Sequence, residues 1–156
     1  MYRLRGDTMD IIRKALLNDL PYLIELFFQL EGVTKNENNG KAEETFKRIL
    51  KNENQHILVA ECENVVCASV TVTVIESLTH GNRPYAVVEH VITHKDYRGR
   101  GYAFELLNRA RDIAIQADCY KIMLITGRSE ETVHNLYKRA GYKNDGKTAY
   151  TMYLDL

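Results

Sequence analysis

Apolar residues recur at intervals of three and four positions in four segments of the chain, a spacing that predicts amphipathic helices. The clearest segment is 103–117, in which alanines, leucines and isoleucines fall on one helical face. The other expected helices cover Leu20 to Leu30, Lys41 to Leu50 and Glu130 to Ala140. Gly141 directly follows the last of them, as helix-terminating glycines do.

Between these segments the apolar residues alternate or run together, which predicts strands. The expected strands are Ile11–Lys14, His56–Glu63, Val65–Ile75, Tyr85–Thr93, Lys121–Thr126 and Thr148–Leu154. A tight hairpin turn at Glu63 and Asn64 joins the second strand to the third, in which valines alternate with serine and threonine. The Lys121–Thr126 run is almost continuously apolar and is expected to be buried on both faces. This order predicts a mixed α/β sheet with helices on both faces.

The chain has 156 residues, which fits a single domain over 1–156. Met9 is an alternative start, and residues 1–8 would then be an upstream extension. No apolar run reaches the length of about 18 residues that a membrane-spanning helix needs. The first ten residues also lack the apolar core of a signal peptide. We therefore expect a cytoplasmic protein that does not bind a membrane.

Charge and cysteine content limit the partners further. Lysine and arginine number 21 and aspartate and glutamate number 21, so the net charge is zero, which disfavours a nucleic-acid-binding protein. Cys62, Cys67 and Cys119 form an odd set; a Cys62–Cys67 disulfide across the hairpin is conceivable, but buried free thiols are preferred. His90 and His94 have the spacing of a zinc pair, but no third ligand motif accompanies them, and we expect no metal.

The most informative stretch runs from Tyr97 to Ala103, between the Tyr85–Thr93 strand and the 103–117 helix. Glycines at such a junction permit positive φ angles and close backbone approach. The first amides of the helix have no partners within it, so with the helix dipole they form an anion site suited to a pyrophosphate. Arg98 and Arg100 add forked donors that match phosphate oxygens.

Two other phosphate motifs are absent from this stretch. Tyr97 to Ala103 contains no GxxxxGK[ST] loop, and the dinucleotide pattern GxGxxG fails there because position 104 is phenylalanine. The pattern that fits is [QR]xxGx[GA], with Arg98, Gly101 and Ala103 at its fixed positions. A glycine turn with solvated arginines is the simpler alternative, but the strand before and the helix after favour the anion site.

With these residues the chain resembles the GNAT superfamily of acetyl-CoA-dependent N-acetyltransferases, most strongly over Glu89 to Tyr142. Within it, the chain is similar to glucosamine-6-phosphate N-acetyltransferases in three places. The matching segments are Glu89-His90-Val91 with Tyr97-Arg98-Gly99-Arg100-Gly101, Cys119-Tyr120-Lys121, and Leu136-Tyr137-Lys138-Arg139-Ala140-Gly141-Tyr142. The resemblance implies a GNAT-like fold of six to seven mostly antiparallel strands and about four helices, with a splay between the fourth and fifth strands.

The resemblance also assigns roles to residues. It implies that acetyl-CoA binds along the backbone of Val91, Ile92 and Thr93 and at the loop that follows. The loop residues are Arg98, Gly99, Arg100, Gly101, Tyr102 and Ala103. Glu89 is implied as the general base, acting directly or through water, and its alternative is a strand glutamate that faces solvent.

Tyr137 lies four residues before Gly141, as in the family's C-terminal motif, and is implied as the acid that protonates the coenzyme A thiolate. Its alternative is an aromatic packing residue. The family often carries an asparagine four or seven residues before this tyrosine, where this chain has Val133 and Glu130, so that contact is not expected. Direct transfer in a ternary complex is preferred over an acetyl-cysteine route, because no cysteine falls on the motifs.

The acceptor is expected to be a primary amine of a small metabolite, chosen by Leu20–Leu50, Ser77–Tyr85 and Thr126–Glu131. Arg83 and Arg128 are candidates for binding an acidic group on it. An aminosugar phosphate, an aminoalkylphosphonate and an amino acid all stay open. The alternatives are a protein N-terminal or lysine acetyltransferase and a non-catalytic acetyl-CoA sensor. A homodimer formed through the last strands is a further expectation from the resemblance.

Overall fold

The computed structural model describes residues 10–31, 40–144 and 146–154. The sequence-based interpretation of residues 1–8 as an extension therefore lies outside the described residues. The elements are β1 (Ile11–Lys14), α1 (Leu20–Glu31), α2 (Lys41–Lys51), β2 (Gln55–Cys62), β3 (Val65–Ile75), β4 (Tyr85–Thr93), α3 (Tyr102–Gln116), β5 (Ile122–Leu124) and α4 (Glu131–Arg139). Short 3₁₀ turns, η1 (Leu17–Asp19) and η3 (Lys95–Tyr97), precede α1 and α3. Among the described residues no helix is long and apolar enough to cross a membrane.

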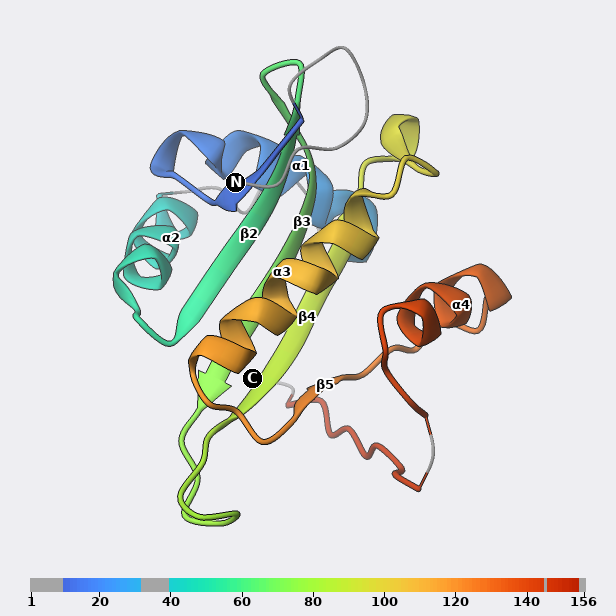
Figure 1. Ribbon diagram of the computed structural model, residues 1–156. Helices are drawn as coiled ribbons and strands as arrows, with labels where there is room; N and C mark the ends of the chain where they lie inside the picture. Colours follow the sequence, from blue (N-terminus) through green and yellow to red (C-terminus); the bar gives the residue numbers. More distant parts are fainter. Residues whose placement is uncertain (1–9, 32–39, 145, 155–156) are drawn as a thin grey trace.

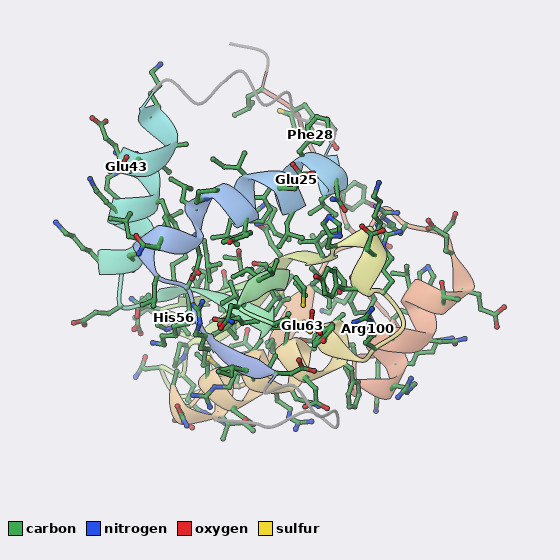
Figure 2. The ribbon with its side chains drawn as sticks, turned by 90° about the horizontal axis from the view of Figure 1, so that it is seen from above. Glu25, Phe28, Glu43, His56, Glu63 and Arg100 are labelled. Atoms are coloured by element: carbon green, nitrogen blue, oxygen red, sulfur yellow. The ribbon has the colours of Figure 1, made fainter. Side chains whose placement is uncertain are left out.

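The sheet has the order β1-β2-β3-β4-β5. The first four strands are antiparallel, whereas β5 runs parallel to β4. Glu63 and Asn64 both have positive φ, which confirms the predicted hairpin turn between β2 and β3. The mixed α/β class is therefore confirmed, with α1 and α2 on one face of the sheet and α3 on the other (Figures 1 and 2).

Each face of the sheet carries its own core. On the α3 face, Val70, Val72 and Leu106 belong to one buried cluster; on the α1 and α2 face, Leu23 and Phe46 belong to another. Because both faces are covered, the polar residues that alternate with the valines of β3 are buried as well. These residues are Ser69 and Thr71.

The predicted number of strands is wrong for the described part of the chain, which contains five strands instead of six or seven. Thr148–Leu154 forms no strand there, and its large apolar side chains are exposed, from Leu154 at 76% to Tyr150 at 92%. A strand needs a hydrogen-bonding neighbour, and this segment has none in the described residues.

The strand predicted over Lys121–Thr126 is shorter and less buried than expected. Only Ile122–Leu124 pair with β4, and all three are half-buried, while Ile125 is exposed. β5 is the edge strand of the sheet, and after Leu124 the chain leads away from β4 toward α4 (Figure 1). The continuous apolar run therefore predicted a strand correctly here, but it did not predict how far that strand is buried.

Candidate active site

The loop before α3 has the conformation that its glycines predict. Gly99 and Gly101 have φ of +78° and +93°, and Gly101 is the N-cap of α3. Both values lie in the left-handed region that L side chains rarely adopt. Among the described residues, no heavy atom would lie within 4 Å of a side-chain carbon at either glycine, so the loop is open at these positions. The first N–H groups of α3 have no partner within the helix, as an anion site requires.

The two arginines of the loop fold back onto it. Arg98 Nε donates to the Thr93 carbonyl at 3.2 Å, and Arg100 Nη2 donates to the Asp96 carbonyl at 3.4 Å. The Arg100 guanidinium also lies 5.0 Å from the centre of the Tyr97 ring. Both side chains are exposed at the same end of the molecule, where Figure 2 shows Arg100 beside the start of α3. The arginines thus shape the loop and add positive charge to it.

Tyr102 was expected to contact the cofactor because of its place in the motif, but its side chain is not available to a ligand. Its side chain is buried under the loop, and its phenol donates to Asp10 Oδ2 at 3.1 Å. Asp10 is also buried, and its Oδ1 has no hydrogen-bond partner among the described residues. Tyr102 can therefore offer only its backbone N–H to a ligand. Asp10 had no motif to mark it, and sequence reasoning missed it.

Strands β4 and β5 diverge at the site. Their pairing begins at Ala86–Ile122 and ends at Val88–Leu124. From position 89 onward, the edge of β4 that faced β5 has no strand partner in the described residues. An unpaired edge offers backbone donors and acceptors to a ligand, which is the opening expected between the fourth and fifth strands.

The predicted backbone contacts lie along this open edge. Ile92 packs its side chain into the α1 and α2 core, and Val91 packs against the α3 core. Thr93 is half-buried, with its carbonyl already bonded to Arg98. The side chains of Val91 and Ile92 thus pack into the cores, and Val91, Ile92 and Thr93 all line the cavity in front of the loop.

Glu89 and His90 precede Val91 at a β-bulge in β4, and only one of the two lines the cavity. Glu89 is opposite Thr71 on β3, is exposed, and is not among the residues that line the cavity. His90 does line it, and its ring centre lies 5.4 Å from that of Phe27 on α1. The sequence indicated His90 only as half of a zinc pair, since no local pattern reveals a bulge.

Tyr137, on α4, lies across the cavity from β4. The phenol hydrogen-bonds Thr126, and its ring packs edge-on to Tyr142 with centres 6.2 Å apart. Burial raises the pKa of Tyr137 above its ordinary value, although the hydrogen bond to Thr126 and the charge of Arg128 act in the opposite direction. A phenol with a raised pKa keeps its proton at neutral pH and can donate it.

One cavity of about 1510 Å³ joins these parts. It is lined by the Arg98–Ala103 loop, the end of β4 and the face of α4 that carries Tyr137. Its volume exceeds the roughly 300–1,000 Å³ typical of a small-ligand cleft, so two reactants fit side by side. Arg128 lies on the wall near Tyr137, and its Nη1 is 3.4 Å from Glu130 Oε1.

Arg83, the other candidate for an acidic group, lies elsewhere. It donates to the carbonyls of Asp118 and Cys119, and its Nη2 is 3.0 Å from Asp118 Oδ1. These contacts are at the start of β4, at the end of the strand opposite the cavity. Arg83 therefore has a structural partner, and only Arg128 of the two faces the cavity.

Comparison with known proteins identifies the fold. A model of the Acetyltransferase (GNAT) family matches residues 20–142. The chain belongs to this family. The match includes α1, the Arg98–Ala103 loop and Tyr137, so the GNAT match spans the residues that line the cavity, with the exception of Asp10.

Solved structures agree with this GNAT assignment. A protein from Agrobacterium tumefaciens str. C58 assigned as an acetyltransferase is 33% identical with a TM-score of 0.86, over 92% of this chain and 99% of that one. Glucosamine-6-phosphate N-acetyltransferase from Arabidopsis thaliana shares the fold at 22% identity and a TM-score of 0.84, over 94% and 99%. A Clostridium acetobutylicum protein solved with acetyl-CoA shares it at 24% and 0.71, over 94% and 96%.

Proposed function

We propose that this chain transfers the acetyl group of acetyl-CoA to the primary amine of a small metabolite, by direct attack in a ternary complex. The observation that carries the proposal is the single cavity that joins the anion loop at the start of α3 to Tyr137 on α4. A transferase needs both features in one cavity, because the thioester and the amine must meet in a fixed geometry.

The residues present fit acetyl-CoA. The left-handed glycines, the open space in front of them and the N-terminal amides of α3 suit a pyrophosphate, and Arg98 and Arg100 supply charge. The open backbone edge of β4 over Val91–Thr93 suits the amides of the pantetheine arm. One of its N–H groups would stabilise negative charge on the thioester oxygen.

Tyr137 is proposed as the general acid. It keeps its proton at neutral pH because burial raises its pKa, and it would donate that proton to the thiolate when the carbon–sulfur bond breaks. Glu89 is proposed as the residue that helps to remove the amine proton, directly or through water. Its exposure, and its absence from the cavity wall, favour the route through water.

Two of the cysteines are poor nucleophiles for a covalent route. Cys62 and Cys67 are free thiols buried in the sheet, and burial raises the pKa of Cys67 to about 12. Cys119 is half-buried at the far end of β4, near Arg83. Cys62 is the one of the three that lines the cavity, but its side chain is only 3% exposed. The burial of Cys62 and Cys67 and the place of Cys119 outside the cavity lining support direct attack over an acetyl-cysteine intermediate.

The acceptor is proposed to carry an acidic group. Arg128 lies on the cavity wall beside Tyr137, where a phosphate or carboxylate on the incoming amine would meet its guanidinium. Aminosugar phosphates, aminoalkylphosphonates and amino acids share this chemistry. Within the cell we propose a cytoplasmic location, no metal requirement and a homodimer.

A panel assay tests the proposed function. Thiol release from acetyl-CoA is measured with aminosugar phosphates, aminoalkylphosphonates, amino acids and lysine-containing peptides as acceptors, with and without a chelator. We expect chelator-insensitive release with at least one small anionic amine. Release with peptides alone would indicate a protein acetyltransferase. Tight binding of acetyl-CoA without release from any acceptor would indicate a sensor instead.

A further inference from the structure

The bulge in β4 places one residue in an unusual backbone conformation. Along β3 the pairing moves two positions, from Thr71 to Ser69, while along β4 it moves three, from Glu89 to Ile92. One extra residue is therefore inserted in β4. His90 falls in this insertion with φ of +52°, in the left-handed region that glycine usually occupies in such bulges.

His90 differs from the other non-glycine residues with positive φ in the described part of the chain. The others all lie in turns and are Glu63, Asn64, His80, Asn82 and Asp118. His90 alone lies within a strand. A left-handed residue with a side chain costs about 1–2 kcal/mol relative to glycine, so the side chain at this position is held against a backbone penalty.

The bulge also decides which way His90 faces. Val88 and Val91 pack on the α3 face of the sheet. The His90 ring contacts Phe27 of α1, on the opposite face, and lines the cavity with Leu30 of α1. Without the extra residue, strict alternation would place position 90 on the α3 face. The bulge thus turns the imidazole away from the core toward the α1 side of the cavity.

We propose that His90 is the group that accepts the proton which the neutral amine loses as it attacks, an inference that rests on the proposed acetyl transfer. Glu89 keeps the earlier step, the removal through water of the extra proton that makes the free amine an ammonium. The amine nitrogen bonds to the acetyl carbon as the carbon–sulfur bond breaks. The nitrogen's proton goes to the free imidazole nitrogen of His90, and the thiolate takes the phenolic proton of Tyr137. The imidazolium then returns one proton through water to the phenolate, and both residues regain their starting states.

His90→Gly and His90→Asn test this assignment. Both residues tolerate positive φ, so the bulge is kept while the imidazole is removed. We expect kcat with the best acceptor to fall about 10²-fold in both variants, with an unchanged dissociation constant for acetyl-CoA. His80 has nearly the same φ, +53°, in the exposed loop before β4. Contrary to the acceptor role expected from the sequence for Ser77–Tyr85, no residue of that loop lines the cavity. His80→Gly and His80→Asn are therefore matched controls, expected to stay within about twofold of wild type.

Chemical rescue separates a proton-transfer role from a structural one. Added imidazole should raise the kcat of His90→Gly at least tenfold. It should not accelerate His90→Asn or Glu89→Gln. The assignment is overturned if His90→Gly and His90→Asn keep wild-type kcat, or if His90→Gly is slow and imidazole does not accelerate it. A wild-type enzyme that releases no thiol with any amine would overturn the proposed function itself, which is a distinct result.

Discussion

At the scale of single residues, three tyrosine hydroxyls in or near the site differ in their hydrogen bonds. Tyr137 hydrogen-bonds Thr126 in the cavity, Tyr102 donates to Asp10 under the loop, and the buried Tyr142 oxygen has no partner in the described residues. Burial raises the pKa of all three, that of Tyr142 to about 12. The surroundings of each tyrosine thus decide whether its hydroxyl has a hydrogen-bond partner and which group that partner is.

Tyr137→Phe should lower kcat about 10²-fold and leave the dissociation constant of acetyl-CoA within about twofold, because the ring is kept and only the proton donor is lost. Steady-state kinetics and calorimetric titration measure the two quantities. Tyr142→Phe is the matched control on the same aromatic pair. An unchanged kcat in Tyr137→Phe would remove this residue from the mechanism.

Tyr102→Phe should lower the free energy of unfolding by roughly 1–3 kcal/mol, because the buried carboxylate of Asp10 loses the hydrogen bond from the phenol. Tyr142→Phe should be neutral or stabilising, since it removes a buried hydroxyl that has no hydrogen-bond partner among the described residues. Urea unfolding of both variants gives the comparison. Equal losses in the two would show that the Tyr102–Asp10 hydrogen bond contributes nothing.

At the scale of elements, two contact sets hold the frame of the site. Arg83 ties the loop before β4 to the turn before β5, where the Tyr120 N–H also donates to the Pro84 carbonyl at 2.9 Å. The strands are thus fixed together at one end and open at the other. On β1, Arg13 Nη1 is 2.6 Å from Asp19 Oδ2 and its Nη2 is 2.7 Å from Glu61 Oε2, which joins η1 to the sheet edge.

The two arginines that sequence reasoning treated alike should behave differently. Arg128→Ala should raise the KM of an anionic acceptor about tenfold, since its guanidinium lines the cavity. Arg83→Ala should leave that KM unchanged and cost no more than about 1 kcal/mol of stability, because its ion pair is partly exposed. Kinetics with charged and uncharged forms of one acceptor measure the difference. A raised KM in Arg83→Ala alone would contradict this assignment.

The Arg13–Asp19 ion pair makes the free energy of unfolding depend on pH. Burial alone would raise the pKa of Asp19, but the hydrogen bonds from Arg13 and from the Leu16 N–H outweigh it and hold that pKa below its ordinary value. Because the folded-state pKa is the lower one, the stabilisation is fully present at neutral pH. It is lost as the pH falls below about 3.9, the ordinary aspartate value, toward the folded-state pKa.

Asp19→Asn should therefore cost roughly 1–3 kcal/mol at about pH 7 and clearly less at about pH 3. Urea unfolding at the two pH values measures this. Glu43→Gln, at an exposed pair with Lys47, is the control and should change stability by less than about 0.5 kcal/mol. A cost for Asp19→Asn that is the same at both pH values would contradict the pKa direction.

At the scale of the whole molecule, the sheet ends on an unsatisfied edge. Within the described part of the chain, β5 pairs only with β4, and residues 148–154 leave their large apolar side chains exposed. In an extended strand, Tyr150, Met152 and Leu154 fall on one face. An unpaired edge and an unpaired apolar segment are complementary, which supports the proposed homodimer, in which residues 148–154 of one copy add to the β5 edge of the other.

Met152→Lys combined with Leu154→Lys should convert the dimer to a monomer, because the two charges would be buried against the partner. Light scattering coupled to size-exclusion chromatography measures the mass. Leu78→Lys, at a still more exposed leucine in the loop before β4, should leave the dimer intact. A wild-type protein that is monomeric at all concentrations would reject the dimer.

Much of the fold could be predicted locally. The periodicity of 103–117 and the Glu63-Asn64 turn determined their elements, because helix and turn conformations depend on residues close in sequence. The Arg98–Ala103 loop was also recognisable, since its glycines must supply the positive φ values that the structure shows. The sequence by itself thus determined the order of the elements from β1 to α4, the family, and the conformation of the Arg98–Ala103 loop.

Only the tertiary structure decided how the parts face one another. The divergence of β4 and β5, the separation of Arg83 from Arg128, and the burial of Tyr102 on Asp10 all depend on contacts between residues far apart in the chain. The bulge that turns His90 into the cavity is such a case, because it arises from pairing with β3. Pairing between distant strands is set by the packed whole, and so no local pattern could reveal it.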